Sequence, residues 1–198
     1  MIGAVLLAAG GSRRFGSDKL LAPLPDGTPV AVAAAATLVR ASSQVIAVVR
    51  PGADALVEAL HASGAQAVIC PNAAEGMGTS LACGVAAASG WDGWLIALAD
   101  MPFVSEQTVR AVVAAVAEGA ALAAPSYRGT RGHPVCFGAA YRQALLALRG
   151  DRGGRELVAA AGDRLRRIDC DDPGVLADID HPADLERCAA WYAPRGRG

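Results

Sequence analysis

The sequence predicts an α/β fold in which a mostly parallel sheet lies between two layers of helices. Short apolar runs alternate with longer segments of helical period, which is typical of chains that build parallel sheets. Apolar residues make up 53% of the chain and aromatic residues only 5%, with Ala and Val supplying the excess. Such small side chains suit close packing of helices on a sheet. The length of 198 residues is enough to bury a sizeable core.

The strands are predicted where apolar runs of strand length occur. A continuous apolar run, such as the first one, is typical of a parallel strand that is buried on both faces. The predicted strands are residues 2–8, 44–49, 66–70, 94–99 and 121–125, with shorter candidates at 134–137 and 165–169.

Helices are predicted between these runs. Residues 105–118 place four valines on one face, Val109, Val112, Val113 and Val116. Ser105 can cap the start. The other predicted helices are residues 28–41, 53–63, 79–88, 139–148 and 155–161, and a last one that begins at residue 182. We expect a single domain over residues 1–193 and a disordered tail over 194–198. Ligands are expected at the carboxyl ends of the strands.

Composition excludes several classes of protein. The formal net charge is −1 and no basic stripe is present, so no nucleic-acid partner is expected. No uncharged apolar stretch reaches the roughly 20 residues that span a membrane, and the apolar start lacks the positive segment of a signal peptide. The five cysteines are widely spaced without a CxxC pattern, which argues against zinc and favours a reducing compartment. We therefore expect a soluble, cytoplasmic protein.

A glycine-rich loop follows the first strand. Its glycines allow a close backbone approach to an anion, while Arg14 and Lys19 add positive charge suited to a triphosphate. It is not a P-loop, because Ser17 rather than Lys follows Gly16, and GxGxxG is absent. The alternative is a flexible turn with exposed arginines. The segment reads Leu7-Ala8-Ala9-Gly10-Gly11-Ser12-Arg13-Arg14-Phe15-Gly16-Ser17-Asp18-Lys19.

Two further signals follow later strands. Gly78, Thr79 and Ser80 stand at a predicted helix start, where N–H groups and hydroxyls can bind an anion or simply cap the helix; the two roles are compatible. Asp100 ends the apolar strand 94–99 before Met101-Pro102. A carboxylate there suits a magnesium ion that also holds substrate phosphates, and the alternative is a turn that begins with Asp.

The C-terminal part places glycines beside positive charge and ends in alternating carboxylates. Such glycine–cation segments suit an anionic acceptor, although solvated loops are the alternative; the residues concerned are Arg131, His133, Arg152 and Arg155. Asp178 and Asp180 alternate on an extended segment and so point to the same side. One of them can complete the magnesium site, or both can serve as an acidic cap on the last helix.

These motifs resemble those of the nucleotidyltransferases similar to molybdenum cofactor cytidylyltransferase. The family opens with Leu-Ala-Ala-Gly, continues with Ser-x-Arg-(Met/Phe)-Gly and places Lys three positions later, as residues 7–19 do here. Residues 75–81, 100–102, 131–134, 150–155 and 178–185 match its later motifs in order. Gly154 stands where the family commonly has Ala, and His181 where it usually has Thr.

The resemblance implies a three-layer α/β/α, Rossmann-like fold of the nucleotide-diphospho-sugar transferase type and a magnesium-dependent enzyme. It implies that Asp100 binds Mg²⁺, with the second ligand at Asp180. The residues expected to be catalytic are Arg14, Lys19 and Asp100. Those expected to bind the nucleotide are Leu7, Ala8, Ala9, Gly10, Gly11, Ser12, Arg14, Lys19, Gly78, Thr79 and Ser80. Acceptor contacts are expected from Arg131, His133, Arg152 and Arg155.

The resemblance also implies a reaction: transfer of CMP from CTP to the phosphate of molybdenum-bound molybdopterin, which releases pyrophosphate and forms molybdopterin cytosine dinucleotide. Ala9 favours CTP, because the sibling guanylyltransferases usually open with Leu-Ala-Gly-Gly. A GTP-dependent guanylyltransferase and a sugar- or alcohol-phosphate nucleotidyltransferase are alternatives within the class. A non-catalytic delivery protein for a molybdoenzyme is the alternative outside it. A molybdoenzyme or a maturation chaperone is the protein partner implied.

Overall fold

The computed structural model describes residues 1–10 and 18–189. Its strands are β1 (Ile2–Leu7), β2 (Val45–Val49), β3 (Gln66–Ile69), β4 (Gly93–Leu98), β5 (Leu122–Tyr127), β6 (Thr130–Arg131), β7 (Val135–Gly138) and β8 (Leu165–Asp169). Its α-helices are α1 (Val30–Ala41), α2 (Asp54–Ala62), α3 (Met77–Ala87), α4 (Glu106–Ala117), α5 (Arg142–Leu146), α6 (Arg155–Ala161) and α7 (Pro182–Ala189). The predicted tail, residues 194–198, lies outside the described residues.

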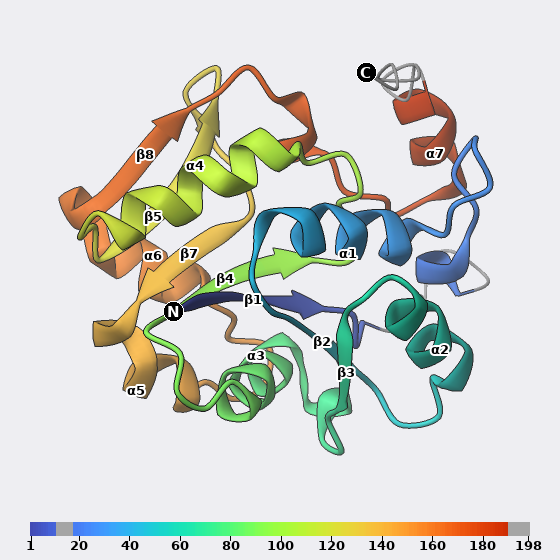
Figure 1. Ribbon diagram of the computed structural model, residues 1–198, viewed down its shortest axis with the longest axis horizontal. Helices are drawn as coiled ribbons and strands as arrows, with labels where there is room; N and C mark the ends of the chain where they lie inside the picture. Colours follow the sequence, from blue (N-terminus) through green and yellow to red (C-terminus); the bar gives the residue numbers. More distant parts are fainter. Residues whose placement is uncertain (11–17, 190–198) are drawn as a thin grey trace.

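One mixed sheet carries all of these strands (Figure 1). The strand order is β3-β2-β1-β4-β7-β5-β6, and β8 pairs with β5 in parallel. The strands β1 to β4 are parallel, which confirms the predicted sheet. The strand β7 runs antiparallel to both of its neighbours because its connection from β5 is too short for a helical crossover. The two-residue strand β6 in that connection was not predicted.

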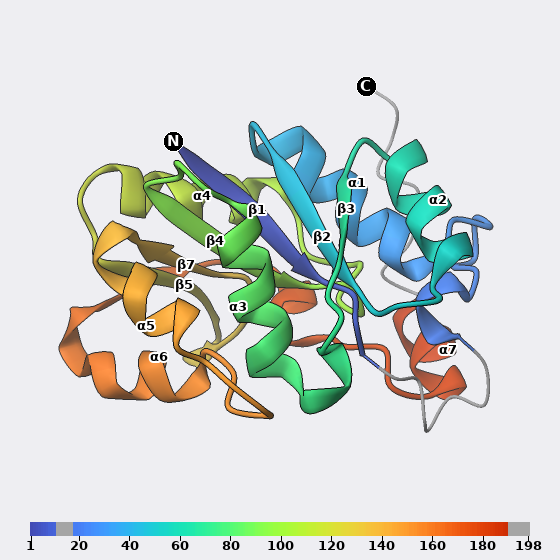
Figure 2. The same cartoon turned by 90° about the horizontal axis from the view of Figure 1, so that it is seen from below.

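Alternating side chains along the central strands feed two cores, one on each face of the sheet. Leu6, Ala47 and Leu95 pack under α1, α2 and α4, whereas Val5, Val48 and Ile96 pack under α3, α5 and α6. Figure 2 shows these helix layers on the two sides of the sheet. The three-layer architecture that the resemblance implied is therefore present.

The helix boundaries follow the predictions with local differences. Ser105 caps α4 by accepting a hydrogen bond from the Thr108 N–H, and Val109 and Val112 are fully buried, as predicted. The segment predicted as one helix over 139–148 is a 3-10 turn (Ala139–Tyr141) followed by the short α5. A 3-10 turn at Lys19–Leu21, named η1, was not predicted. In the described part of the chain, no helix combines the length and the apolar character that crossing a bilayer requires.

A third, smaller apolar cluster lies at the carboxyl edge of the sheet. Leu24 and Val30 at the start of α1 meet Phe103 after β4, together with Ala177 and Ile179 from the segment before α7. The cluster thus joins three segments that are far apart in the sequence. It fixes the backbone from which the predicted site residues project.

Candidate functional site

Lys19, Asp100 and Asp180 meet at the carboxyl edge of the sheet. Lys19 begins η1, Asp100 follows β4, and Asp180 lies two residues before α7. The Lys19 Nζ atom lies 2.8 Å from Asp100 Oδ2 and 2.8 Å from Asp180 Oδ1. The structure therefore brings together one residue predicted to contact phosphate and both predicted metal ligands.

Backbone contacts hold the two carboxylates in place. The Ile179 N–H donates to the Asp100 carbonyl oxygen over 2.9 Å, which links the segment after β4 to the segment before α7. The buried Asp184 carboxylate accepts hydrogen bonds from the N–H groups of Asp180 and His181. These bonds, chiefly the one from His181, lower the pKa of Asp184, so it stays ionised as the cap of α7. Asp180 is thus positioned by a cap four residues beyond it.

The Lys19 ammonium is stabilised in its charged form. Burial alone lowers the pKa of Lys19, but hydrogen bonds to Asp100 and Asp180, together with their charges, outweigh burial and raise the pKa above its ordinary value. The Lys19 side chain is 13% exposed, whereas those of Asp100 and Asp180 are 24% and 42% exposed. The two carboxylates therefore remain accessible from the solvent side of the cluster.

The donor set of this cluster fits a divalent cation that is shared with phosphate. Two carboxylate oxygens face one cation position, which the ammonium of Lys19 holds here. Within residues 1–10 and 18–187, no group of three or more Asp, Glu, His or Cys side chains could hold a metal. Magnesium commonly takes one or two protein carboxylates and completes its shell with substrate phosphates and water. Asp100 and Asp180 match that requirement.

Arg50 ties together the two ends of the predicted nucleotide loop. Its guanidinium donates to the Gly10 carbonyl oxygen over 3.1 Å and to Asp18 Oδ2 over 3.0 Å. Leu7 ends β1, and Ala8 donates its N–H to the Val48 carbonyl oxygen. Gly11, Ser12 and Arg14 lie outside the described residues. Arg50 was not among the predicted site residues, although its place directly after β2 was a signal that could have found it.

The start of α3 packs against residues 150–153. The Gly78 N–H donates to the Gly150 carbonyl oxygen over 2.7 Å, and Thr79 Oγ1 accepts from the Gly150 N–H over 3.0 Å. The buried Ser80 hydroxyl donates to the Gly76 carbonyl oxygen. In this arrangement, polar groups of the predicted nucleotide-binding trio are engaged within the protein. They also link that trio to the loop that carries Arg152.

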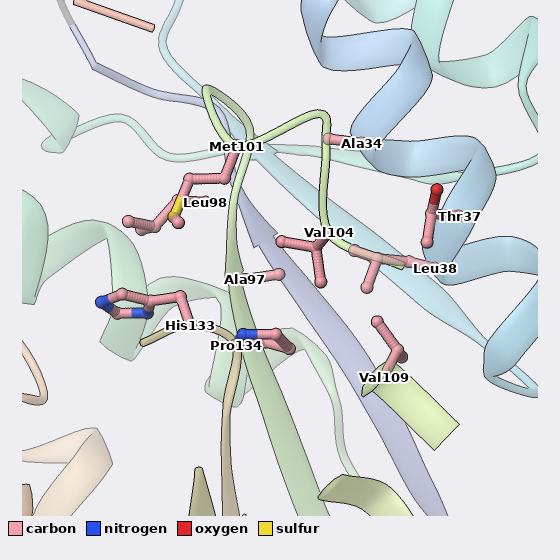
Figure 3. Close-up of a pocket in the computed structure, with 10 residues that line it drawn as sticks. All are labelled: Ala34, Thr37, Leu38, Ala97, Leu98, Met101, Val104, Val109, His133 and Pro134. Atoms are coloured by element: carbon pink, nitrogen blue, oxygen red, sulfur yellow. The ribbon is translucent and has the colours of Figure 1, made fainter. Parts of the chain in front are cut away.

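The four predicted acceptor residues occupy three different places. Arg131 and Arg155 line one open pocket beside α6, and Arg152 is exposed in the loop that packs on α3. His133 instead lines a small apolar cavity with Met101 and Pro134, beneath α1 and next to β4 (Figure 3). The structure therefore brings only Arg131 and Arg155 together.

His133 is neutral at pH 7. Burial and, secondarily, the charge of Arg131 lower its pKa to about 4, and Asp178 opposes this shift only in part. Its Nδ1 atom is buried and has no hydrogen-bond partner in the described part of the chain. An uncharged imidazole in this position cannot contribute a positive charge to an anionic acceptor.

The fold and the cluster at its edge define a nucleotidyltransferase-type protein. Residues 4–167 match the family described as the MobA-like NTP transferase domain, and the chain belongs to that family. It is 33% identical over 196 residues to the purine catabolism protein PucB of Bacillus subtilis, covering 92% of this chain and 93% of that protein. It is 30% identical over 192 residues to nicotine blue oxidoreductase of Paenarthrobacter nicotinovorans, covering 92% and 94%.

Solved structures with similar folds include two of related sequence. A nucleotidyl transferase from Methanothermobacter thermautotroptrophicus superimposes with a TM-score of 0.81 at 29% identity, over 97% of both chains. Rv0371c of Mycobacterium tuberculosis in complex with manganese superimposes with a TM-score of 0.78 at 26% identity, over 96% of this chain and 98% of that one. The predicted family and its nucleotide-diphospho-sugar transferase fold are thereby confirmed.

Proposed function

We propose that this protein transfers CMP from CTP to the phosphate of molybdenum-bound molybdopterin, releases pyrophosphate and forms molybdopterin cytosine dinucleotide. An oxygen of the acceptor phosphate attacks the α-phosphorus of CTP, and the bond from that phosphorus to the pyrophosphate oxygen breaks. The observation that carries the proposal is the convergence of Lys19, Asp100 and Asp180 at the carboxyl edge of β4. Ala9 in the opening loop supports CTP over GTP.

The side chains of the cluster act by position and charge, because an acceptor phosphate is already ionised and needs no protein base. Asp100 and Asp180 would hold Mg²⁺, which offsets the charge that develops on the phosphate oxygens. Lys19 exchanges its carboxylate partners for oxygens of the leaving pyrophosphate. A lysine ammonium keeps its charge at neutral pH, so it can make that contact. Arg14 is proposed to share this role.

Other substrates within the class remain alternatives: GTP with the same acceptor, or a nucleotide with a sugar- or alcohol-phosphate. A carrier without turnover is the alternative outside the class. Lys19, Arg14 and Asp100 together argue against a carrier, because a protein that only binds the cofactor would not need all three. The names of the two curated relatives differ in the chemistry they state, so they do not decide between these alternatives.

The test is pyrophosphate release from CTP, GTP, UTP and ATP, each in parallel with Mg²⁺ and molybdenum cofactor. We expect release with CTP and at least tenfold less with the other three nucleotides. Release with GTP but not CTP would overturn the cytidylyl assignment and leave the transferase assignment intact. If none of the four nucleotides released pyrophosphate in a preparation that binds CTP, the result would favour the carrier.

A further inference from the structure

A second cationic region lies away from the Lys19–Asp100–Asp180 cluster. Arg131 on β6, Arg155 at the start of α6 and Arg167 on β8 line one pocket, whose space, open to solvent, is about 1150 Å³. Asp163 is the carboxylate among the lining residues. Arg167 was not among the predicted site residues, and the strand pairing brings it to Arg131 and Arg155.

The arginines of this pocket differ from the paired arginines elsewhere in the fold. Arg40, Arg50, Arg110, Arg166 and Arg187 each form a salt bridge with a carboxylate. Arg131, Arg155 and Arg167 form none within the described residues. Burial lowers the pKa of Arg131, and the charges of Arg155 and Arg167 lower it further. Three guanidinium groups thus line one concavity without a salt bridge, and the one lining carboxylate, Asp163, can offset only one of their three charges.

The neighbouring residues Arg166 and Arg167 show that the placement on β8 is specific. Successive side chains on a strand point to opposite faces of the sheet. Arg166 points toward α4, where it lies 3.4 Å from Glu118 Oε2, whereas Arg167 points into the pocket beside α6. One arginine has a protein carboxylate as its partner, and the other faces a pocket that could receive an anion.

The sheet order separates this pocket from the first cluster. The strand β8 lies three strands from β4, through β7 and β5. At about 4.8 Å per strand spacing, this is about 14 Å across the sheet. Arg167 also pairs in register with Ala124, well before the carboxyl end of β5. An anion in the pocket is therefore not the phosphate that reacts beside Asp100.

We propose that Arg131, Arg155 and Arg167 form a phosphate subsite that holds the monoester or diphosphate group of a small molecule. Guanidinium groups fork onto two oxygens of such a dianion, and its two negative charges would relieve their repulsion. The pocket is open and large enough for a small molecule that carries the group. The ligand is a free phosphorylated effector, because the single phosphate of the proposed molybdopterin acceptor is the one that reacts beside Asp100.

The binding test titrates pyrophosphate by calorimetry, in chelator and without nucleotide, into the full chain carrying Lys19→Gln, which removes the cation proposed to contact pyrophosphate at the first cluster. We expect Arg167→Gln to weaken pyrophosphate binding at least tenfold, since charge-assisted bonds of this kind are worth more than one decade. Arg166→Gln, the adjacent arginine on the opposite face, should stay within twofold of the Lys19→Gln chain. Unaltered circular dichroism and melting temperature would establish that both variants fold.

Two results would overturn the subsite. One is an unchanged affinity in Arg167→Gln, and the other is an equal loss in Arg166→Gln, which would indicate a general charge effect. The titration needs neither metal nor turnover. A negative titration therefore does not contradict the proposed transfer reaction, and an inactive wild type does not affect the titration. In turnover, a tenfold higher KM for the acceptor alone in Arg167→Gln would mean that the acceptor carries a second phosphate, and it would contradict both the effector and molybdopterin as the acceptor. Loss of a response to added phosphate with unchanged KM identifies an effector.

Discussion

The two charged regions of this molecule balance their charge in opposite ways. At the carboxyl edge of β4, Lys19 lies 2.8 Å from each of two carboxylates, and its pKa is raised. Beside α6, three arginines share a pocket without a salt bridge among the described residues, and the pKa of Arg131 is lowered. In the first region the cation is paired with two protein carboxylates, whereas in the second the three arginines face one lining carboxylate, Asp163, and keep an excess of positive charge.

The difference suggests how each region meets its ligand. If the first cluster binds a metal as proposed, we expect it to rearrange, because Lys19 holds one oxygen of each carboxylate. An unbalanced pocket needs no such exchange, and an anion there stabilises the folded chain directly through linkage. We therefore expect substitutions in the first region to affect turnover most, and substitutions in the second to affect ligand affinity.

The largest expected effect is a loss of turnover when one carboxylate of the Lys19–Asp100–Asp180 cluster is neutralised. Asp100→Asn removes one of the two charges that face the shared cation position, and we expect pyrophosphate release to fall about 10³-fold, in the range seen when one preorganised charge contact is lost. The matched control is Asp92→Asn. Asp92 lies on the amino side of β4, as Asp100 lies on its carboxyl side, and it pairs with the N-terminus. Its variant should keep turnover within twofold, and an equal loss in both would contradict the site.

The sequence predicted the parts of the fold that local patterns encode. Continuous apolar runs located the central strands, and the valine spacing with Ser105 located α4. The direction of β7 and the presence of β6 depend on a short reversal after β5, which leaves little signal in hydropathy. The short 3-10 turn at Lys19 is likewise set by the Asp18 side chain, which accepts from the Leu20 N–H, rather than by periodicity.

The site was predictable where strand order alone determines position. Asp100 follows β4, so the rule for carboxyl edges placed it at this edge. Lys19 was singled out by the charge of its glycine-rich loop, and Asp180 by the alternating carboxylates and the family resemblance. Arg50, which joins Gly10 and Asp18, was missed because a single arginine after a strand has many ordinary uses. Arg167 was missed because only the pairing of β8 with β5 brings it near Arg131. His133 was expected among cationic residues, yet burial keeps it neutral.

The second largest effect is expected at Gly78, where the start of α3 packs on the loop that carries Arg152. A Cβ at Gly78 would overlap the carbonyl oxygen of Arg152 and approach that of Gly150 to 3.0 Å. Both obstacles are backbone atoms, so Gly78→Ala must displace the loop from α3. We expect a loss of about 2–3 kcal/mol in the free energy of unfolding, as for other overpacked sites. Denaturant titration measures it.

Gly153→Ala is the control for that displacement, because it lies in the same contact. The nearest atom to a Cβ at Gly153 is the side-chain sulfur of Met77, at 3.2 Å, and this side chain can rotate away. We expect a loss of under about 1 kcal/mol. If Gly78→Ala were no more destabilised than Gly153→Ala, the loop would not be held against α3 as described.

The smallest expected effect is a pH-dependent loss of stability at His133. Burial and the charge of Arg131, which lines the pocket beside α6, lower the pKa of this histidine. Its pKa is about 4 in the folded chain and about 6.5 when unfolded. The unfolded state therefore binds more protons between these values, so His133 makes stability fall as the pH drops from about 6.5 toward 4. After allowance for its partial exposure, we expect this loss to be about 1–2 kcal/mol.

Denaturant titration at pH 7 and pH 4.5 measures that loss as the difference between wild type and His133→Asn, in which the carboxylate contributions cancel. The control for loss of an imidazole as such is His61→Asn, which replaces an exposed histidine of α2. Arg131→Gln removes one charge that lowers the pKa of folded His133. The folded pKa should rise, so the pH range over which His133 costs stability should become narrower at its acidic limit. If the free energy of unfolding changed equally with pH in the wild type and in His133→Asn, the imidazole of His133 would be solvated. If Arg131→Gln left the pH range of this stability loss unchanged, the arginine charges beside α6 would already be neutralised. The two charged regions would then not differ as described.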